Sequence, residues 1–226
     1  MRGLKQKMFF EGKYFHFEYD EADHEVAGSM ISIAEDTYEE VASRFQIAVM
    51  NDRFTFQICP DTATFISAAG KTAETWQPWM VGSADYAKRF VCILSPRVVS
   101  DRSLADMLKI VKHEVTHIVF DSLGDPDAAC IGISEGIAVW IAGQIEPDLL
   151  QVKEAPSMIK LNDEDYFYEN SGYQYSGVYA GYFLEKFGIE AFKKIYAGIE
   201  RLDEYLYNGF EAEAIMNAKN TCSINV

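Results

Sequence analysis

Basic residues are scarce in this chain. Lys and Arg total 20 against 35 Asp and Glu, which gives 226 residues a formal net charge of −15. Nucleic acids and anionic membranes bind proteins largely through positive charge, so this balance argues against both as partners. An acidic field can attract basic peptides, but an acidic surface more often serves only solubility.

Long apolar runs are also missing. No segment approaches the roughly 18 consecutive apolar residues of a membrane span, and no run of signal-peptide length precedes Glu11. The chain has no repeat and no linker rich in Pro, Gly or Ser. The cysteines lack the spacing of metal ligands or of a disulfide framework; they are Cys59, Cys92, Cys130 and Cys222. We therefore expect a cytoplasmic protein whose oligomeric state cannot be read from the sequence.

The period of the apolar residues changes along the chain. Alternation and β-branched runs predict strands at residues 15–19, 54–58 and 88–95. Helical spacing dominates after Gln144, where helices are expected at about 173–187, 189–200 and 203–218. This order indicates an α+β fold. We expect one domain, with a sheet-containing part at about 8–125 and a mostly helical part at about 126–226.

Two of the four histidines stand four residues apart in the stretch His113-Glu114-Val115-Thr116-His117. On a helix, positions i and i+4 lie on one face, so both imidazoles can bind a single metal ion. The carboxylate of Glu114 then lies near the metal, where it can take a proton from water. The motif predicts a hydrolytic zinc site with one Zn²⁺ per chain. The alternative is a pair of surface histidines on an amphipathic helix.

The residues around this motif predict a helix. Ser103 and Asp106 form a capping signal at its start, and Gly124 and Pro126 supply a stop. Apolar residues recur at helical spacing between these limits, as expected for a helix with one face in the core; they are Leu104, Leu108, Val111, Val115 and Ile118. The two histidines share a second face beside this apolar face.

A catalytic zinc ion usually takes three protein ligands and leaves one position to water. The third candidate is Glu135, which stands in an otherwise apolar stretch that reads as a helix beginning near Ser134 and ending near Gly143. A buried carboxylate is costly unless a partner compensates it, and a metal does so. Gly136 leaves room for a close approach of another helix. Taken alone, Glu135 is better explained as an acidic residue at a helix N-terminus that interacts with the helix dipole; its pairing with the histidine motif favours the metal ligand.

His-Glu-x-x-His followed by Ser-Glu-Gly-x-Ala on the next helix resembles the gluzincin metallopeptidases, and most closely the small peptidase-MA-like domains. The resemblance implies a zincin-like fold: a small mixed sheet with an edge strand over the active-site helix, then a helical C-terminal part. It implies that His113, His117 and Glu135 bind zinc and that Glu114 is the general base. It covers about residues 8–200, and is strong only over 104–142.

The chain departs from the better-known gluzincins at two points. Val139 stands where thermolysin-like enzymes keep an Asp that orients a ligand histidine, so Asp121 or a loop carbonyl is the candidate replacement. No histidine follows His117, so the oxyanion must be stabilised by another residue, and tyrosines of segment 166–182 are the candidates. We choose Tyr175, with Tyr173 next. Regular spacing of tyrosines here equally fits a half-buried packing face.

The likeness to zincins also suggests where a substrate binds. It implies that strand 88–95 is the sheet edge above the metal, where a peptide can pair by strand addition. The segment Trp76–Ala84 is then a loop that lines the cleft or covers the core.

The sequence thus predicts a zinc metallopeptidase that acts on a peptide or protein substrate. Whether it is an endo- or exopeptidase is not readable. One alternative is a catalytically idle zinc-binding domain that recruits a partner through its edge strand, although an idle domain need not keep Glu114. The other is a non-peptidase hydrolase or a highly selective regulatory protease.

Overall fold

The computed structural model describes residues 6–124 and 129–223. The chain divides into two compact units, residues 1–119 and 120–226, and each is described by itself. The division lies a few residues before the change at about residue 125 that the sequence suggests. The stop expected at Pro126 falls outside the described residues.

The first unit is built on a five-stranded mixed sheet in the order β1-β2-β3-β5-β4. Its strands are β1 (Lys7–Glu11), β2 (Phe15–Asp20), β3 (Phe54–Cys59), β4 (Gly82–Asp85) and β5 (Phe90–Leu94). The inner pairs β2–β3 and β3–β5 are parallel, whereas β1 and β4 run antiparallel to their neighbours. Mixed helix and sheet content confirms the expected α+β class.

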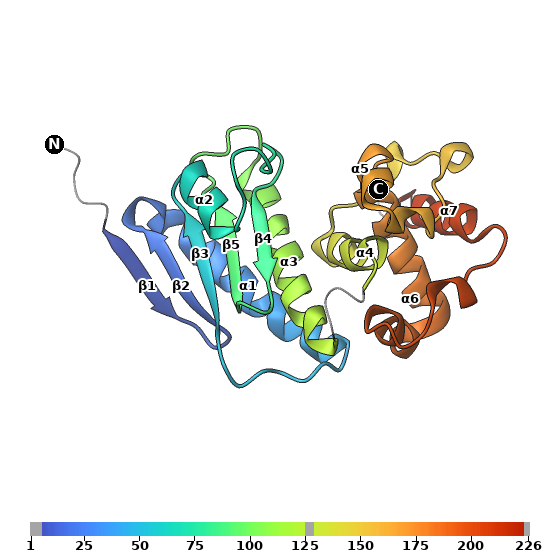
Figure 1. The fold of residues 1–226 in the computed structure, drawn as a ribbon, viewed down its shortest axis with the longest axis horizontal. Coiled ribbons are helices and arrows are strands. Elements are labelled where there is room, and N and C mark those ends of the chain that lie inside the picture. Colours follow the sequence, from blue (N-terminus) through green and yellow to red (C-terminus); the bar gives the residue numbers. More distant parts are fainter. Residues whose placement is uncertain (1–5, 125–128, 224–226) are drawn as a thin grey trace. The chain divides into compact units, whose positions relative to one another are not determined.

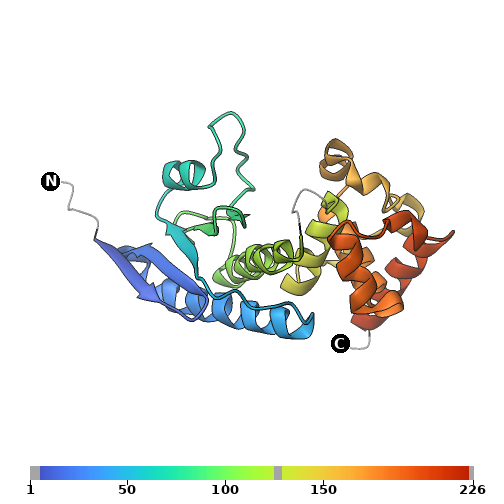
Figure 2. The same ribbon diagram turned by 60° about the horizontal axis from the view of Figure 1, so that its bottom comes forward.

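Helices cover both faces of this sheet. They are α1 (His24–Arg44), α2 (Thr62–Ala68) and α3 (Leu104–Phe120). Helices α1 and α3 lie on one side of the sheet and α2 on the other (Figures 1 and 2). On the α1 side, Phe15 and Phe54 meet Tyr38 of α1, with ring centroids 5.8 and 6.2 Å away. All three rings are buried. The apolar residues whose alternation predicted β2 and β3 are therefore those that face the core.

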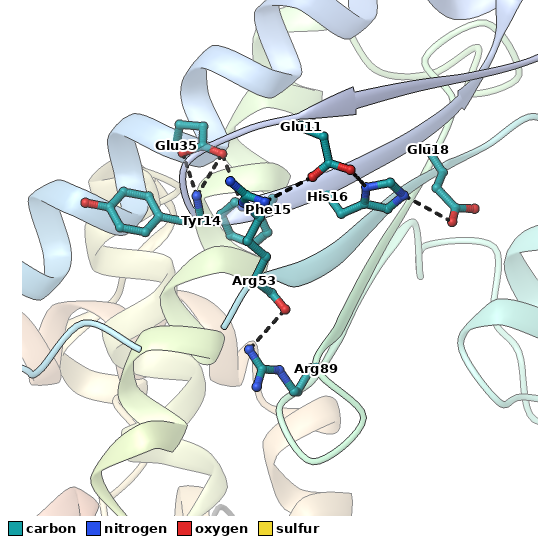
Figure 3. Close-up of polar contacts among 8 residues, drawn as sticks. All are labelled: Glu11, Tyr14, Phe15, His16, Glu18, Glu35, Arg53 and Arg89. Atoms are coloured by element: carbon teal, nitrogen blue, oxygen red, sulfur yellow. Dashed lines mark hydrogen bonds and ion pairs between the residues drawn. The ribbon is translucent and has the colours of Figure 1, made fainter. Parts of the chain in front are cut away.

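Helix α1 is also tied to the sheet by a polar contact. The carboxylate of Glu35 accepts hydrogen bonds from the main-chain N–H of Tyr14, at 3.1 and 3.2 Å, and of Phe15, at 3.2 Å (Figure 3). These two amides stand where β2 begins. A side chain of α1 therefore accepts the hydrogen bonds of the two main-chain N–H groups at the start of β2.

The prediction that strand 88–95 forms the sheet edge is wrong. That segment becomes β5, which lies between β3 and β4, and the edge strand is β4. Residues 91–94 are all buried, and burial on both faces is typical of an interior strand with a continuous apolar run. The edge comes instead from the end of the segment that was expected to be a loop, where Gly82-Ser-Ala-Asp85 carries little apolar signal.

The second unit is helical. Its helices are α4 (Ile131–Ala142), α5 (Glu164–Glu169), α6 (Gly172–Tyr196) and α7 (Phe210–Ser223), joined by short 3₁₀ turns. Helix α6 contains the expected break at Gly188, which has a φ of 84°. The tail helix begins later than the predicted residue 203. In the described part of the chain, every helix is too short or too polar to cross a bilayer.

Glycines let α4 and α6 approach closely. A Cβ atom built on Gly136 lies 2.5 Å from the main-chain oxygen of Ser176 in α6, so any larger residue forces a shift. Glycines of α6 face α4 in the same way. A Cβ atom built on Gly177 lies 2.6 Å from a methyl carbon of Val139, and one built on Gly181 lies 2.4 Å from Nε1 of Trp140. The expected close approach at Gly136 is confirmed. Helix α4 nevertheless begins at Ile131, three residues before the expected start.

Candidate metal centre

Helix α3 carries the His-Glu-x-x-His motif and begins where the sequence predicts. The N–H of Asp106 donates to Ser103 Oγ at 3.2 Å, and the N–H of Ser103 donates to Asp106 Oδ2 at 3.1 Å. These reciprocal contacts form a capping box. Val111, Val115 and Ile118 are fully buried. Because this apolar face of α3 is buried in the core, it fixes the direction in which the side chains of the motif point.

The two histidines of α3 point their Nε2 atoms at each other. These atoms are 3.0 Å apart, and the ring centroids are 4.8 Å apart. Two nitrogens bound to one tetrahedral zinc ion at 2.0–2.1 Å would be separated by about 3.3 Å. The His113 and His117 nitrogens are thus already spaced much as a shared ion requires. His113 is buried and His117 is half-buried.

Glu135 joins this pair in a group that can hold a metal ion. One ligand atom from each of His113, His117 and Glu135 lies within 4.8 Å of the others. Two imidazoles and one carboxylate form a donor set suited to catalytic zinc. Within residues 6–124 and 129–223, no other such group was found.

Glu114 lies against the edge strand β4. A Cβ atom built on Gly82 would stand 2.5 Å from Glu114 Oε1 and 2.6 Å from a methyl carbon of Ile110. Gly82 therefore makes the space that the Glu114 carboxylate occupies. The sequence had no signal for this role, since Gly82 stood in a segment expected to be a loop. A hydrogen bond to Cys59, then burial and, more weakly, the charge of Glu114 raise the pKa of the Cys92 thiol.

Two tyrosines of the second unit lie within electrostatic range of Glu135. Burial and then the charge of Glu135 raise the pKa of Tyr168. Tyr196 is buried, and its hydroxyl donates to Asp121 Oδ1 at 2.6 Å and lies 3.3 Å from Ser134 Oγ. Burial, Asp121 and, more weakly, Glu135 raise the pKa of Tyr196. Neither was selected from the sequence, where Tyr168 was one of several equivalent tyrosines.

The tyrosines that were selected have other contacts. The Tyr175 hydroxyl accepts from the N–H of Gln151 at 3.1 Å and lies 3.4 Å from its carbonyl oxygen. Tyr175 is buried, and Tyr173 packs on Phe167 with ring centroids 5.0 Å apart. The hydroxyl of Tyr175 thus ties residue 151 to α6. Its predicted role at the oxyanion stays a prediction.

The departure at Val139 has a packing explanation. Val139 is buried and faces Gly177 of α6, so its position in this chain belongs to the α4–α6 interface. Asp121, the candidate replacement for an orienting carboxylate, accepts the hydrogen bond from Tyr196. A carboxylate held by a buried hydroxyl has little rotational freedom, which is the property that an orienting residue needs.

Comparison with known proteins adds no relative to this description. A scan against protein-family models found no match, and searches of curated proteins and of solved structures found none. The resemblance to gluzincins therefore rests on the sequence of this chain alone.

Proposed function

We propose that this protein is a zinc-dependent peptide hydrolase of gluzincin type whose first unit has a zincin-like fold. The observation that carries the proposal is the His113–His117 pair, whose Nε2 atoms lie 3.0 Å apart on a capped helix, together with the grouping of both with Glu135. In the mechanism, His113, His117 and Glu135 would hold the ion. Zinc, when bound, supplies a Lewis acid that acidifies water and polarises a carbonyl.

Glu114 is the proton carrier of the proposed reaction. Its carboxylate takes a proton from the attacking water and later delivers it to the leaving amine. The neighbouring Gly82 leaves this carboxylate room on the helix face beside β4. Because Glu114 adjoins His113 in sequence, the same helix turn positions the base and a ligand.

The edge strand β4 is the proposed substrate platform. Among the described residues it pairs only with β5, so its other side can add a peptide strand. This role was expected for strand 88–95 and moves to β4 because β4 is the edge. A substrate backbone paired there would pass the carboxylate of Glu114, which lies against Gly82.

The decisive experiment separates metal binding from hydrolysis. Purified protein is expected to hold about one zinc per chain and to cleave members of a peptide library, and a chelator should stop cleavage. Glu114→Gln should keep the zinc and lose cleavage by at least about 100-fold, the lower limit for general acid–base catalysis. The matched control is Glu40→Gln, at an exposed position on α1, which should change neither.

Each other result has a definite reading. Unchanged turnover in Glu114→Gln removes Glu114 from the mechanism. Bound zinc without cleavage of any library peptide identifies the idle zinc-binding alternative. Absence of zinc from the unmodified protein, even after incubation with the metal, overturns the proposal.

A further inference from the structure

The outer edge of β1 has main-chain N–H and C=O groups that could pair with another strand. Gly12 N–H donates to the carbonyl of Phe15, and Glu21 N–H donates to the carbonyl of Gln6, both at 2.9 Å. In an antiparallel pair, hydrogen-bonded positions alternate. In this register the groups of Met8 and Phe10 therefore point at β2.

The alternate residues of β1 direct their backbone N–H and C=O groups away from β2. They are Lys7, Phe9 and Glu11. Among the described residues, β1 pairs with no strand other than β2. An exposed edge of this kind is a template for pairing with another chain.

The side chains of β1 are unusually apolar for an exposed edge. Phe9 is 57% exposed and Phe10 is 46% exposed. They lie on opposite faces of the sheet, because Phe9 is paired with Glu18 and Phe10 with Phe17. Edge strands are commonly protected by prolines, bulges or inward-pointing charges, and β1 has none of these between its charged ends. Covering both rings requires a partner that extends the sheet itself.

We propose that β1 pairs antiparallel with β1 of a second copy of this chain, with Phe9 opposite Phe9. This register places Lys7 of each copy opposite Glu11 of the other, so that opposite charges meet at both ends. It also places all three outward-pointing residues in hydrogen-bonded pairs, each of which exchanges two hydrogen bonds. In this antiparallel register, the charges of the strand Lys-Met-Phe-Phe-Glu are thus complementary to those of a second copy of the same strand.

The outer face of the hairpin already holds these charges in place. Glu11 contacts His16 Nδ1 at 2.6 Å and Arg53 Nη1 at 3.2 Å (Figure 3), and Lys7 contacts Glu18 at 3.3 Å. The ring of Phe9 stacks on His16, with centroids 5.9 Å apart. In the proposed dimer, two Phe9 rings meet at the centre of this face, with a charged pair on either side.

A second copy fits this edge better than an unrelated peptide. An arbitrary strand would satisfy the backbone groups, but only a strand with an acidic and a basic end in the right order matches both charges. The contact of two five-residue strands is small compared with the about 1,200 Å² of a stable interface. The dimer should therefore be weak and depend on protein concentration.

Sedimentation of the full chain over a wide concentration range tests the proposal. The unmodified chain should show a reversible monomer–dimer equilibrium. Phe9→Pro should weaken dimerisation by at least about tenfold, because it removes an N–H that points outward and leaves the bonds to β2 intact. The matched control is Phe9→Thr, which keeps the N–H and a strand-forming residue and should dimerise more strongly than Phe9→Pro.

Charge exchange tests the register. Lys7→Glu and Glu11→Lys should each weaken the dimer roughly tenfold, since like charges then stand opposite one another. The double variant restores opposite pairs and should recover most of the association. Thermal unfolding of each variant shows whether the monomer remains folded.

Three results would overturn the proposal. One is a chain that stays monomeric at millimolar concentration. Another is a dimer that neither Phe9→Pro nor the single charge variants weaken. The third is a monomeric chain whose Phe9→Pro variant loses binding of an added peptide, which would make this edge a peptide site. Zinc content and cleavage are measured separately, so these results leave the proposed hydrolysis untouched.

Discussion

Helices α3 and α4 reach their folded states by different routes. Helix α3 starts at a capping box between Ser103 and Asp106 and buries one apolar face. Helix α4 has no side-chain cap at Cys130, and seven of its twelve residues are buried, including Gly136 and Val139. Local side chains therefore set the start of α3, whereas no side chain caps the start of α4 and its buried residues pack against α6. The histidine pair and Glu135 should therefore respond to different kinds of mutation.

The largest expected effect tests the surroundings of α3. Gly82→Ala places a methyl group within 2.5 Å of Glu114 Oε1, so the carboxylate has to move. If Glu114 is the base, a displacement of about 1 Å can lower kcat about 100-fold. Zinc content should not change, because neither histidine is touched.

The control for this experiment is Ser83→Ala, which alters the next residue of β4 and should retain activity. Measurement of kcat and of the zinc content of both variants tests this prediction. Full activity in Gly82→Ala would show that Glu114 tolerates displacement, and would weaken its assignment as the base.

The next effect tests α4. In Gly136→Ala, the new methyl group meets the main-chain oxygen of Ser176 at 2.5 Å. Because main-chain atoms cannot rotate away, α4 and α6 must separate, and the free energy of unfolding should fall by about 1–3 kcal/mol. Chemical denaturation measures this change. On α3, the exposed Lys109→Ala should stay within about 0.5 kcal/mol; an equal loss in both variants would contradict the contrast between the helices.

The smallest effect tests the cap of α3. Ser103→Ala removes the hydroxyl that accepts from the N–H of Asp106, and should lower the free energy of unfolding by about 1 kcal/mol. Ser103→Asp restores an acceptor at this position and should recover most of the loss. Denaturant titration of the two variants compares them. If both behave alike, the hydroxyl is not what begins the helix.

Local patterns predicted much of this fold. The alternation of Phe15 and Phe17 indicated β2, the capping box indicated the start of α3, and Gly188 marked the break in α6. In each case the residues that carry the signal also make the structure, through burial, a side-chain hydrogen bond or a positive φ.

Features that depend on distant residues were not predictable in this way. Strand order placed β4 at the edge, although Gly82-Ser-Ala-Asp85 is short and largely without apolar side chains. The start of α4 at Ile131 has no capping side chain to announce it. The spacing of His113 and His117 was predictable because one helix sets it. The hydroxyl contacts of Tyr175 with Gln151 and of Tyr196 with Asp121 were not, since the partners lie far along the chain.

The Glu35 carboxylate links hydrogen exchange at the start of β2 to the docking of α1 on the sheet. Tyr14 and Phe15 have their amides bonded to a side chain of α1, so these amides can exchange hydrogen with solvent only when that helix comes away. Hydrogen exchange at the two positions should therefore follow the undocking of α1 and not the fraying of the neighbouring hairpin. Glu35→Gln should speed both amides together, since a neutral amide is a weaker acceptor than a carboxylate.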